Sequence, residues 1–105
     1  MPERRPPVPR FDLTDALLDG RAEDVLDLHG YYGSEATTRV RNFIISSSRR
    51  YPGKIVHVIT GKGRGSPNGP VLKPLVKRLL QTELSKFVAD CALDLDETGY
   101  RIRLK

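Results

Sequence analysis

Residues 54–73 read KIVHVITGKGRGSPNGPVLK, a stretch in which three kinds of local structure follow one another. The segment KIVHVIT is an almost continuous apolar run rich in β-branched side chains, which is typical of a strand inside a sheet. TGKGRGSPNGP then supplies four glycines and two basic residues, and a helical pattern follows. The stretch therefore predicts a strand, a glycine-rich loop and a helix in direct succession.

The flanking segments indicate further strands and helices. VLKPLVKRLL (71–80) has its apolar residues on one side of a helix. EDVLDLHG (23–30) alternates like a short strand, and SEATTRVRNFIISSSRR (34–50) has the apolar spacing of a helix with one buried face. KFVADCALDLDETGYRIRLK (86–105) indicates two short strands joined by a turn at residues 96–99.

This order of elements predicts a β-α-β-α-β-β fold. The first two strands, joined through a helix, should be parallel through a right-handed crossover. Two helices with one apolar stripe each can cover only one face of a small mixed sheet. We therefore expect an α/β two-layer sandwich over residues 23–105, with the other sheet face at least partly open. Residues 1–22 are expected to be a flexible basic, proline-rich arm and a short acidic segment.

Length and composition narrow the class of protein. The 105 residues suit a single domain, and 38% hydrophobic and 30% charged residues are typical of soluble globular proteins. No apolar run could span a bilayer, and the N-terminus lacks the apolar core of a secretory signal, so we predict a cytoplasmic protein without a membrane partner. A single cysteine, Cys91, excludes an internal disulfide and a cysteine-based zinc site.

The net charge of +5 is unevenly distributed along the chain. Residues 11–33 carry a local balance of −5, whereas residues 36–82 contain ten lysines and arginines and no acidic residue. A basic block of this kind suits a polyanion such as nucleic acid, because phosphate contacts release condensed counterions. A solvated basic face that only aids solubility is the alternative.

The glycine-rich loop is a candidate phosphate-binding element. It matches neither the GxxxxGK[ST] order of a Walker A loop nor the GxGxxG dinucleotide fingerprint, so a mononucleotide cofactor is not expected. Its backbone could approach a phosphate closely at the start of a helix, whose dipole favours anions. A flexible connector is the alternative. The predicted nucleic-acid-binding residues are Gly61, Lys62, Gly63, Arg64, Gly65 and Lys73.

Three side chains are candidate acid–base groups. Asp27 and His29 are two residues apart on one strand and leave the same face, and His57 lies on the next strand just before the glycine-rich loop. If the strands are neighbours, the three could cluster and move protons at a phosphodiester. The alternative is that Asp27 and His29 bond into the turn at Gly30 while His57 is a half-buried strand residue. No cofactor is predicted, although a loosely held Mg or Mn ion is left open.

Two segments resemble the signatures of one family. LDLHG at 26–30 and HVITGKGRGSPNGPVLK at 57–73 are similar to those of the Smr (small MutS-related) domain, over roughly residues 23–105. The resemblance implies a fold similar to the C-terminal domain of translation initiation factor three and a function on nucleic acid. Family members include nucleases that nick branched or duplex DNA and others linked to RNA cleavage at stalled ribosomes.

The resemblance also implies residue roles. Asp27, Leu28, His29 and Gly30 match the family's DLHG, and His57, Thr60, Gly61, Lys62 and Gly63 match its second motif. Asp27 and His29 are then catalytic, His57 assists, and Lys62 and Arg64 hold the nucleic-acid backbone. The chain departs from the family where many relatives carry a GxG stretch before the last strand, because only Gly99 stands there.

The sequence therefore predicts an endonuclease that nicks structured DNA or cleaves RNA. The main alternative is a nucleic-acid- or ribosome-binding module without chemistry, which needs the positive charge but not the imidazoles. A small-metabolite phosphate binder is a third possibility. The residues do not decide between DNA and RNA, and they do not fix the oligomeric state.

Overall fold

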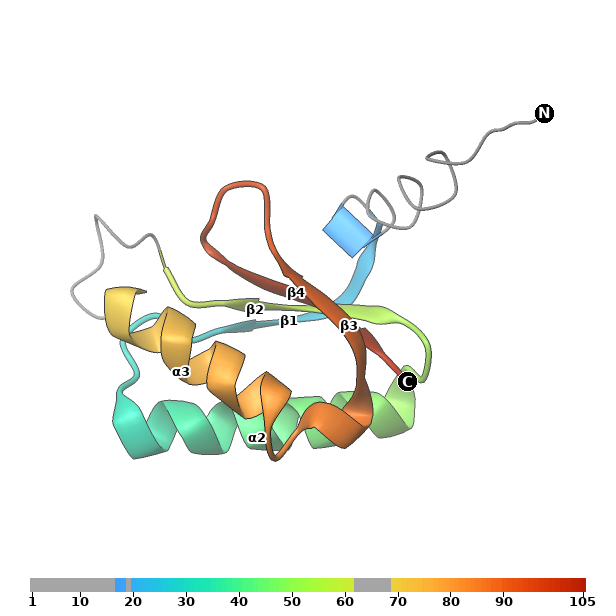
Figure 1. The fold of residues 1–105 in the computed structure, drawn as a ribbon, viewed down its shortest axis with the longest axis horizontal. Coiled ribbons are helices and arrows are strands. Elements are labelled where there is room, and N and C mark those ends of the chain that lie inside the picture. The colour runs from blue at the N-terminus through green and yellow to red at the C-terminus, as the bar shows by residue number, and fades with distance from the viewer. Residues whose placement is uncertain (1–16, 19, 62–68) are drawn as a thin grey trace.

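The computed structural model describes residues 17–18, 20–61 and 69–105, which form a four-stranded sheet with two helices against one face (Figure 1). The predicted α/β two-layer sandwich, with its β-α-β-α-β-β order and mixed sheet, is confirmed. The elements are β1 (Ala22–Asp27), α2 (Gly33–Arg50), β2 (Ile55–Ile59), α3 (Gly69–Gln81), the short 3-10 helix η1 (Ser85–Phe87), β3 (Val88–Leu93) and β4 (Gly99–Leu104). Neither α2 nor α3 is both long and apolar enough to cross a membrane.

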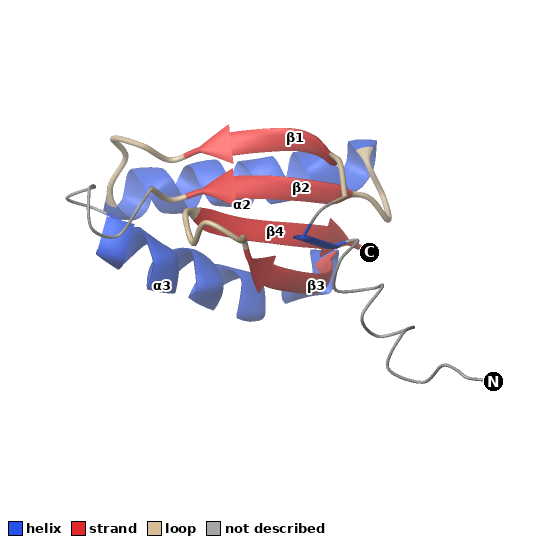
Figure 2. Cartoon of the chain, turned by 90° about the horizontal axis from the view of Figure 1, so that it is seen from above, coloured by secondary structure: helices blue, strands red, loops and turns tan. Residues whose placement is uncertain are grey.

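The strand order in the sheet is β1-β2-β4-β3 (Figure 2). β1 and β2 are parallel, with Val25 opposite His57, as the crossover through α2 predicts. β4 runs antiparallel to both of its neighbours and lies between β2 and β3. Because β1 and β2 are parallel, both end at the same edge of the sheet, and β4 begins there.

The core lies between the helices and one face of the sheet. Val56, Val58 and Ile102 point from the sheet into this layer and are completely buried. Each such aliphatic side chain contributes about 1.5–3 kcal/mol on burial. Their partners on the helices include Ala36, Val40 and Ile44 of α2 and Leu72, Val76, Leu79 and Leu80 of α3. Burial therefore follows the alternation of the strands and the single apolar stripe of each helix.

The other sheet face is partly covered by the chain just before β1. Leu17 is only 3% exposed. The guanidinium of Arg101, on β4, donates a hydrogen bond of 2.7 Å to the carbonyl oxygen of Leu17 and another to that of Gly20. Residues 1–16 lie outside the described part of the chain, so the division into an arm and a domain at residue 22 stays a prediction.

Candidate functional site

Three segments meet at the edge where β1 and β2 end, and we call this the motif edge: residues 27–30, 60–61 and 94–98 (Figure 2). Backbone hydrogen bonds join them. The N–H of Leu28 donates to the carbonyl of Ile59 at 2.8 Å, and the N–H groups of Thr60 and Gly61 donate to the carbonyl of Thr98 at 2.8 and 3.0 Å. The fold thus brings the DLHG turn and the start of the glycine-rich loop together, as the sequence predicts for neighbouring parallel strands.

The start of the glycine-rich loop is held rigidly. Thr60 is completely buried, and its hydroxyl donates a third hydrogen bond to the carbonyl of Thr98, at 3.1 Å. Gly61 has a φ of +100°, a region that glycine adopts without the steric cost of a side chain. A Cβ on Gly99 would overlap the carbonyl oxygen of Val58 and lie 2.8 Å from Cα of Ile59. Glycine at this position therefore lets β4 approach β2 at the motif edge.

His57 forms a side-chain pair with Asp94. Its Nε2 lies 2.8 Å from Oδ2 of Asp94, and the two side chains are 18% and 8% exposed. His57 is on β2 and Asp94 directly follows β3, so the pair ties the β3–β4 turn to β2. With Nε2 donating to the carboxylate, a neutral imidazole keeps Nδ1 as its proton acceptor. This arrangement can take up a proton and stabilise the resulting imidazolium.

Asp94 is held as a carboxylate by its surroundings. Its Oδ1 accepts a 2.8 Å hydrogen bond from the N–H of Thr98, and its Oδ2 accepts one of 2.9 Å from the Thr98 hydroxyl. Burial alone would raise the pKa of Asp94, but the hydrogen bonds from His57 and Thr98 outweigh it and bring the pKa below the ordinary value. The β3–β4 turn therefore presents a charged partner to His57 at neutral pH.

Asp27 and His29 are not part of the His57–Asp94 pair and are joined to each other at the end of β1. Asp27 is exposed at the end of β1, and its Oδ1 accepts a 2.9 Å hydrogen bond from the backbone N–H of His29. His29 is exposed just beyond the strand. Asp27 is opposite Ile59 in the sheet, so it lies on the same face as His57 but two residues further along. Among the described residues, the carboxylate bonded to His57 is Asp94, and no hydrogen bond joins Asp27 to either imidazole.

Asp94 is not among the site residues that the sequence predicts. Its role depends on the insertion of β4 between β2 and β3, which the order of elements along the chain does not give. A signal was present, because Asp94 ends the apolar alternating run of β3 just before the predicted turn. A test of each acidic residue against each possible strand order would have paired it with His57.

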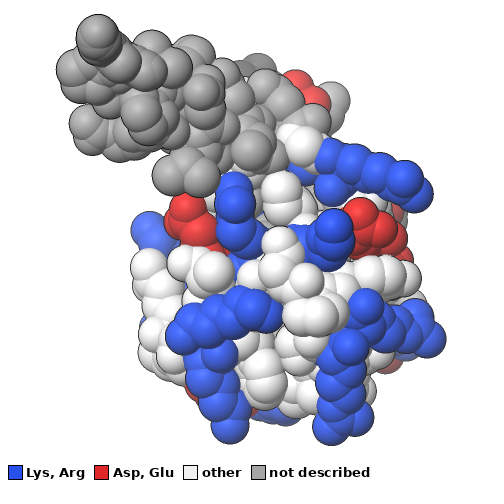
Figure 3. Space-filling model, turned by 90° about the vertical axis from the view of Figure 1, so that its right-hand side faces the viewer, with Lys and Arg blue, Asp and Glu red and all other residues white. Residues whose placement is uncertain are grey.

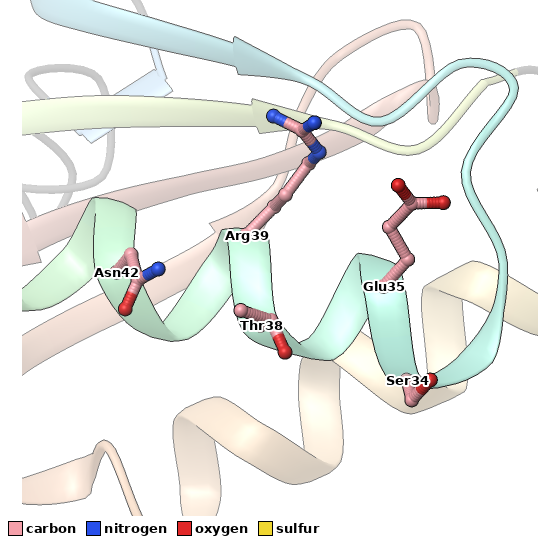
Figure 4. A pocket seen from close by; sticks show the side chains of 5 residues that line it. All are labelled: Ser34, Glu35, Thr38, Arg39 and Asn42. Carbon is pink, nitrogen blue, oxygen red and sulfur yellow. The ribbon is translucent and has the colours of Figure 1, made fainter.

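An open hollow lies along the first half of α2, close to the DLHG turn (Figure 4). Arg39 projects from the helix toward the ends of β1 and β2 in this view, and its guanidinium carbon lies 4.1 Å from the centre of the Tyr31 ring. Tyr31 packs against the core, whereas Tyr32 is 64% exposed and can stack on a base. The lining residues are Ser34, Glu35, Thr38, Arg39 and Asn42.

Part of the predicted binding loop lies outside the described residues, namely Lys62, Gly63, Arg64 and Gly65. Gly61 is at the motif edge, and Lys73 is half-buried in the second turn of α3. Within residues 17–18, 20–61 and 69–105, no group of three or more histidine, cysteine or acidic side chains is arranged to hold a metal ion.

Fold and site together define a small α/β domain with an aspartate–histidine pair and two sequence motifs at the carboxyl ends of parallel strands. The family model of the Smr domain matches residues 26–99, and the chain belongs to this family. The family is generally associated with nucleic-acid binding and with nucleases.

One relative and the solved structures complete the comparison. An uncharacterized protein of Treponema pallidum (strain Nichols) is 43% identical to this chain over 56 residues, which are 53% of the chain and 27% of that protein. The chain thus spans about a quarter of that relative's length. No solved structure matches, so the likeness to the C-terminal domain of translation initiation factor three stays a prediction.

Proposed function

We propose that this protein is an endonuclease that nicks structured DNA or cleaves RNA, with His57, His29 and Asp27 at the catalytic site. The observation that carries the proposal is the His57–Asp94 pair, held at 2.8 Å at the same edge as the DLHG turn and the first residues of the glycine-rich loop. Membership of the Smr family supports it, because that family is associated with nucleases.

His57 acts as the general base in this proposal. In RNA, its Nδ1 takes the proton of a 2′-hydroxyl, and the oxygen attacks the adjacent phosphorus as the bond to the 5′-oxygen breaks. The leaving oxygen receives a proton from protonated His29, giving a cyclic phosphate and a free 5′-hydroxyl. In DNA, a water molecule replaces the 2′-hydroxyl. Asp94 stabilises the imidazolium that forms on His57, in the manner of the carboxylate in a catalytic triad.

Asp27 holds His29 in place through the backbone. Its carboxylate accepts the His29 N–H, and this bond sets the start of the turn from which the imidazole projects. The remaining oxygen of Asp27 makes no hydrogen bond within the described part of the chain, so it is available to a substrate hydroxyl or to a Mg or Mn ion bound with the phosphate. Gly61, Lys73 and residues 62–65 are proposed to hold the nucleic-acid backbone beside these groups.

A nucleic-acid- or ribosome-binding module without chemistry is the second candidate. It is favoured by the Asp27 carboxylate, which accepts the His29 N–H in a local turn, as the alternative interpretation of DLHG expects. Under this candidate, the His57–Asp94 pair only stabilises the β3–β4 turn.

Cleavage and binding measured on the same variants separate the two candidates. Labelled RNA, branched DNA and supercoiled plasmid are incubated with wild-type protein, His57→Ala and His29→Ala, with and without magnesium or manganese. Ser46→Ala, on the exposed side of α2, is the matched control. We expect each histidine variant to cleave at least about a hundredfold more slowly while it binds as tightly as wild type. Binding without cleavage above the variants' background would establish the module instead.

A further inference from the structure

Lysines and arginines gather at the end of the sheet opposite to the motif edge (Figure 3). We call this the basic end. It consists of Arg49, Arg50, Lys54, Lys86, Arg103 and Lys105.

The fold assembles the basic end from segments far apart in the sequence. α2 ends at Arg50, and β2 begins directly after Lys54. The carbonyl of Lys54 accepts a 2.8 Å hydrogen bond from Leu104, which places the end of β4 beside it. The N–H of Lys105 donates to the carbonyl of Phe87 at 3.0 Å, and this brings η1 with Lys86 to the same end. The charges therefore converge through backbone hydrogen bonds and not through neighbouring positions in the sequence.

These cations have few acidic neighbours. The ion pairs among the described residues are Arg41–Glu83 and His57–Asp94, and neither includes a member of the basic end. Asp90 is opposite Arg103 in the sheet, but its Oδ1 accepts the N–H of Cys91 at 2.9 Å. Glu23 and Asp24, at the start of β1, lie at the same end of the sheet as Lys54 and are half-buried, and they follow the exposed Arg21 in the sequence. All six cations except the half-exposed Arg103 are exposed to solvent.

The helix dipole accounts for only part of this charge. The C-terminus of α2 carries about half a negative charge, which Arg49 and Arg50 already exceed. The other four cations lie just before β2, in the 3-10 helix, in β4 and directly after β4. Like charges placed this close repel one another unless a polyanion binds to them.

We propose that the basic end binds the phosphate backbone of nucleic acid as an anchor separate from the motif edge. The proposal rests on the nucleic-acid binding of the proposed function and not on cleavage. An acidic protein or a membrane would be expected to need apolar contacts as well. The exposed large apolar side chains among the described residues lie elsewhere, on β1, at the N-cap of α2 and around the β3–β4 turn: Val25, Tyr32, Leu93 and Leu95. A positively charged surface without an apolar centre suits the phosphate backbone of nucleic acid better than it suits an acidic protein or a membrane.

The separation of the two surfaces suits one nucleic-acid strand. Lys54 and Gly61 are seven residues apart along and beyond β2, which corresponds to roughly 23 Å at about 3.3 Å per residue. A duplex strand advances about 3.4 Å along the helix axis per phosphate, so roughly seven nucleotides connect the motif edge to the basic end. The anchor should therefore contribute to the binding of long oligonucleotides and not to that of fragments of two or three nucleotides.

The test compares two double variants with the same loss of charge. Arg49→Gln with Arg50→Gln removes two cations from the basic end, and Lys77→Gln with Arg78→Gln removes two from the exposed side of α3. Anisotropy of labelled 20-mer RNA and 20-base-pair DNA is followed between 50 and 200 mM salt. For the duplex, we expect the first variant to lower the slope of log K against log salt by about two and the affinity by about tenfold or more. The second variant should change the slope by less than about half as much as the first variant does.

The outcomes distinguish this proposal from the catalytic one. His57→Ala should keep the full salt slope, and Arg49→Gln with Arg50→Gln should cleave at the wild-type rate once substrate is saturated with enzyme. Equal losses in the two double variants, or no loss in either, would overturn the anchor even if cleavage is observed. Phosphatidylserine vesicles and polyglutamate are run in parallel. Weaker binding by the first variant to either of these, without weaker binding to oligonucleotides, would overturn it as well.

Discussion

The two ends of the sheet are built in different ways. At the motif edge, Asp94 is 8% exposed and its carboxylate is bonded to His57 and Thr98, and the Thr98 carbonyl accepts three hydrogen bonds. At the basic end, the cations are largely exposed and none has an acidic partner among the described ion pairs. Proton transfer requires fixed geometry, whereas counterion release requires only charge near phosphate. Under the proposed function, the motif edge serves the chemistry and the basic end serves electrostatic attraction.

The largest effect is expected from Asp94→Asn, which keeps the shape of the side chain and removes its charge. His57 then loses the carboxylate that orients it and stabilises its protonated form. We expect kcat for RNA cleavage to fall by about a hundredfold with little change in KM, because Asp94 acts as a positioning residue through His57.

The control for this prediction is Asp90→Asn, which changes an exposed carboxylate on β3, the strand that leads to Asp94. Equal rates for Asp94→Asn and Asp90→Asn would show that the motif edge does not depend on the pair.

Gly99→Ala should produce the largest loss of stability among these variants. The added methyl group would overlap the backbone of β2, and the resulting strain is expected to cost about 1–3 kcal/mol in urea unfolding. Gly30→Ala is the comparison, because its Cβ has nothing within 4 Å and the cost comes only from the φ of +86°. A smaller loss for Gly99→Ala than for Gly30→Ala would mean that β4 can move away from β2 freely.

Acid should weaken the motif edge through Asp94. The folded pKa of Asp94 is below its ordinary value, so its contribution to stability is fully present above that ordinary value, near pH 4, and is lost as the pH falls through the lower folded pKa. The difference in unfolding free energy between wild type and Asp94→Asn should therefore shrink as the pH falls below about 4. A difference that stays unchanged from about pH 5 down to about pH 2 would contradict the ionised state assigned to Asp94.

The basic end should have the smallest effect on stability. Arg49→Gln with Arg50→Gln removes favourable charges from the C-terminus of α2, which is worth about 1 kcal/mol or less. Thermal unfolding followed by circular dichroism checks this. A large loss would mean that the basic end is structural, and its effect on binding would then have to be measured with Lys54→Gln alone.

The sequence predicts most of the fold because its apolar periodicity agrees with the structure. The spacing in residues 34–50 and 71–80 predicts both helices, and the crossover logic places DLHG beside the glycine-rich loop. The run KIVHVIT forms the interior strand β2 as predicted, and His57 and its two alternating neighbours are half-buried because the helices cover one face only.

The candidate site is harder to predict because it depends on strand order. Asp94 reaches His57 only because β4 pairs with both β2 and β3. The same pairing brings Arg103 and Lys105 to the end of α2, although more than fifty residues separate them from Arg49 along the chain. A long-range contact of this kind leaves no periodic pattern in the sequence.

The most direct test of the central claim is single-turnover cleavage of one labelled RNA with enzyme in excess, for wild type, His57→Ala and Arg49→Gln with Arg50→Gln. We expect His57→Ala to bind normally and to cleave at least about a hundredfold more slowly, while the double variant binds more weakly and cleaves at the wild-type rate when saturated. Cleavage by His57→Ala at the wild-type rate would show that the imidazole at the motif edge takes no part in the chemistry.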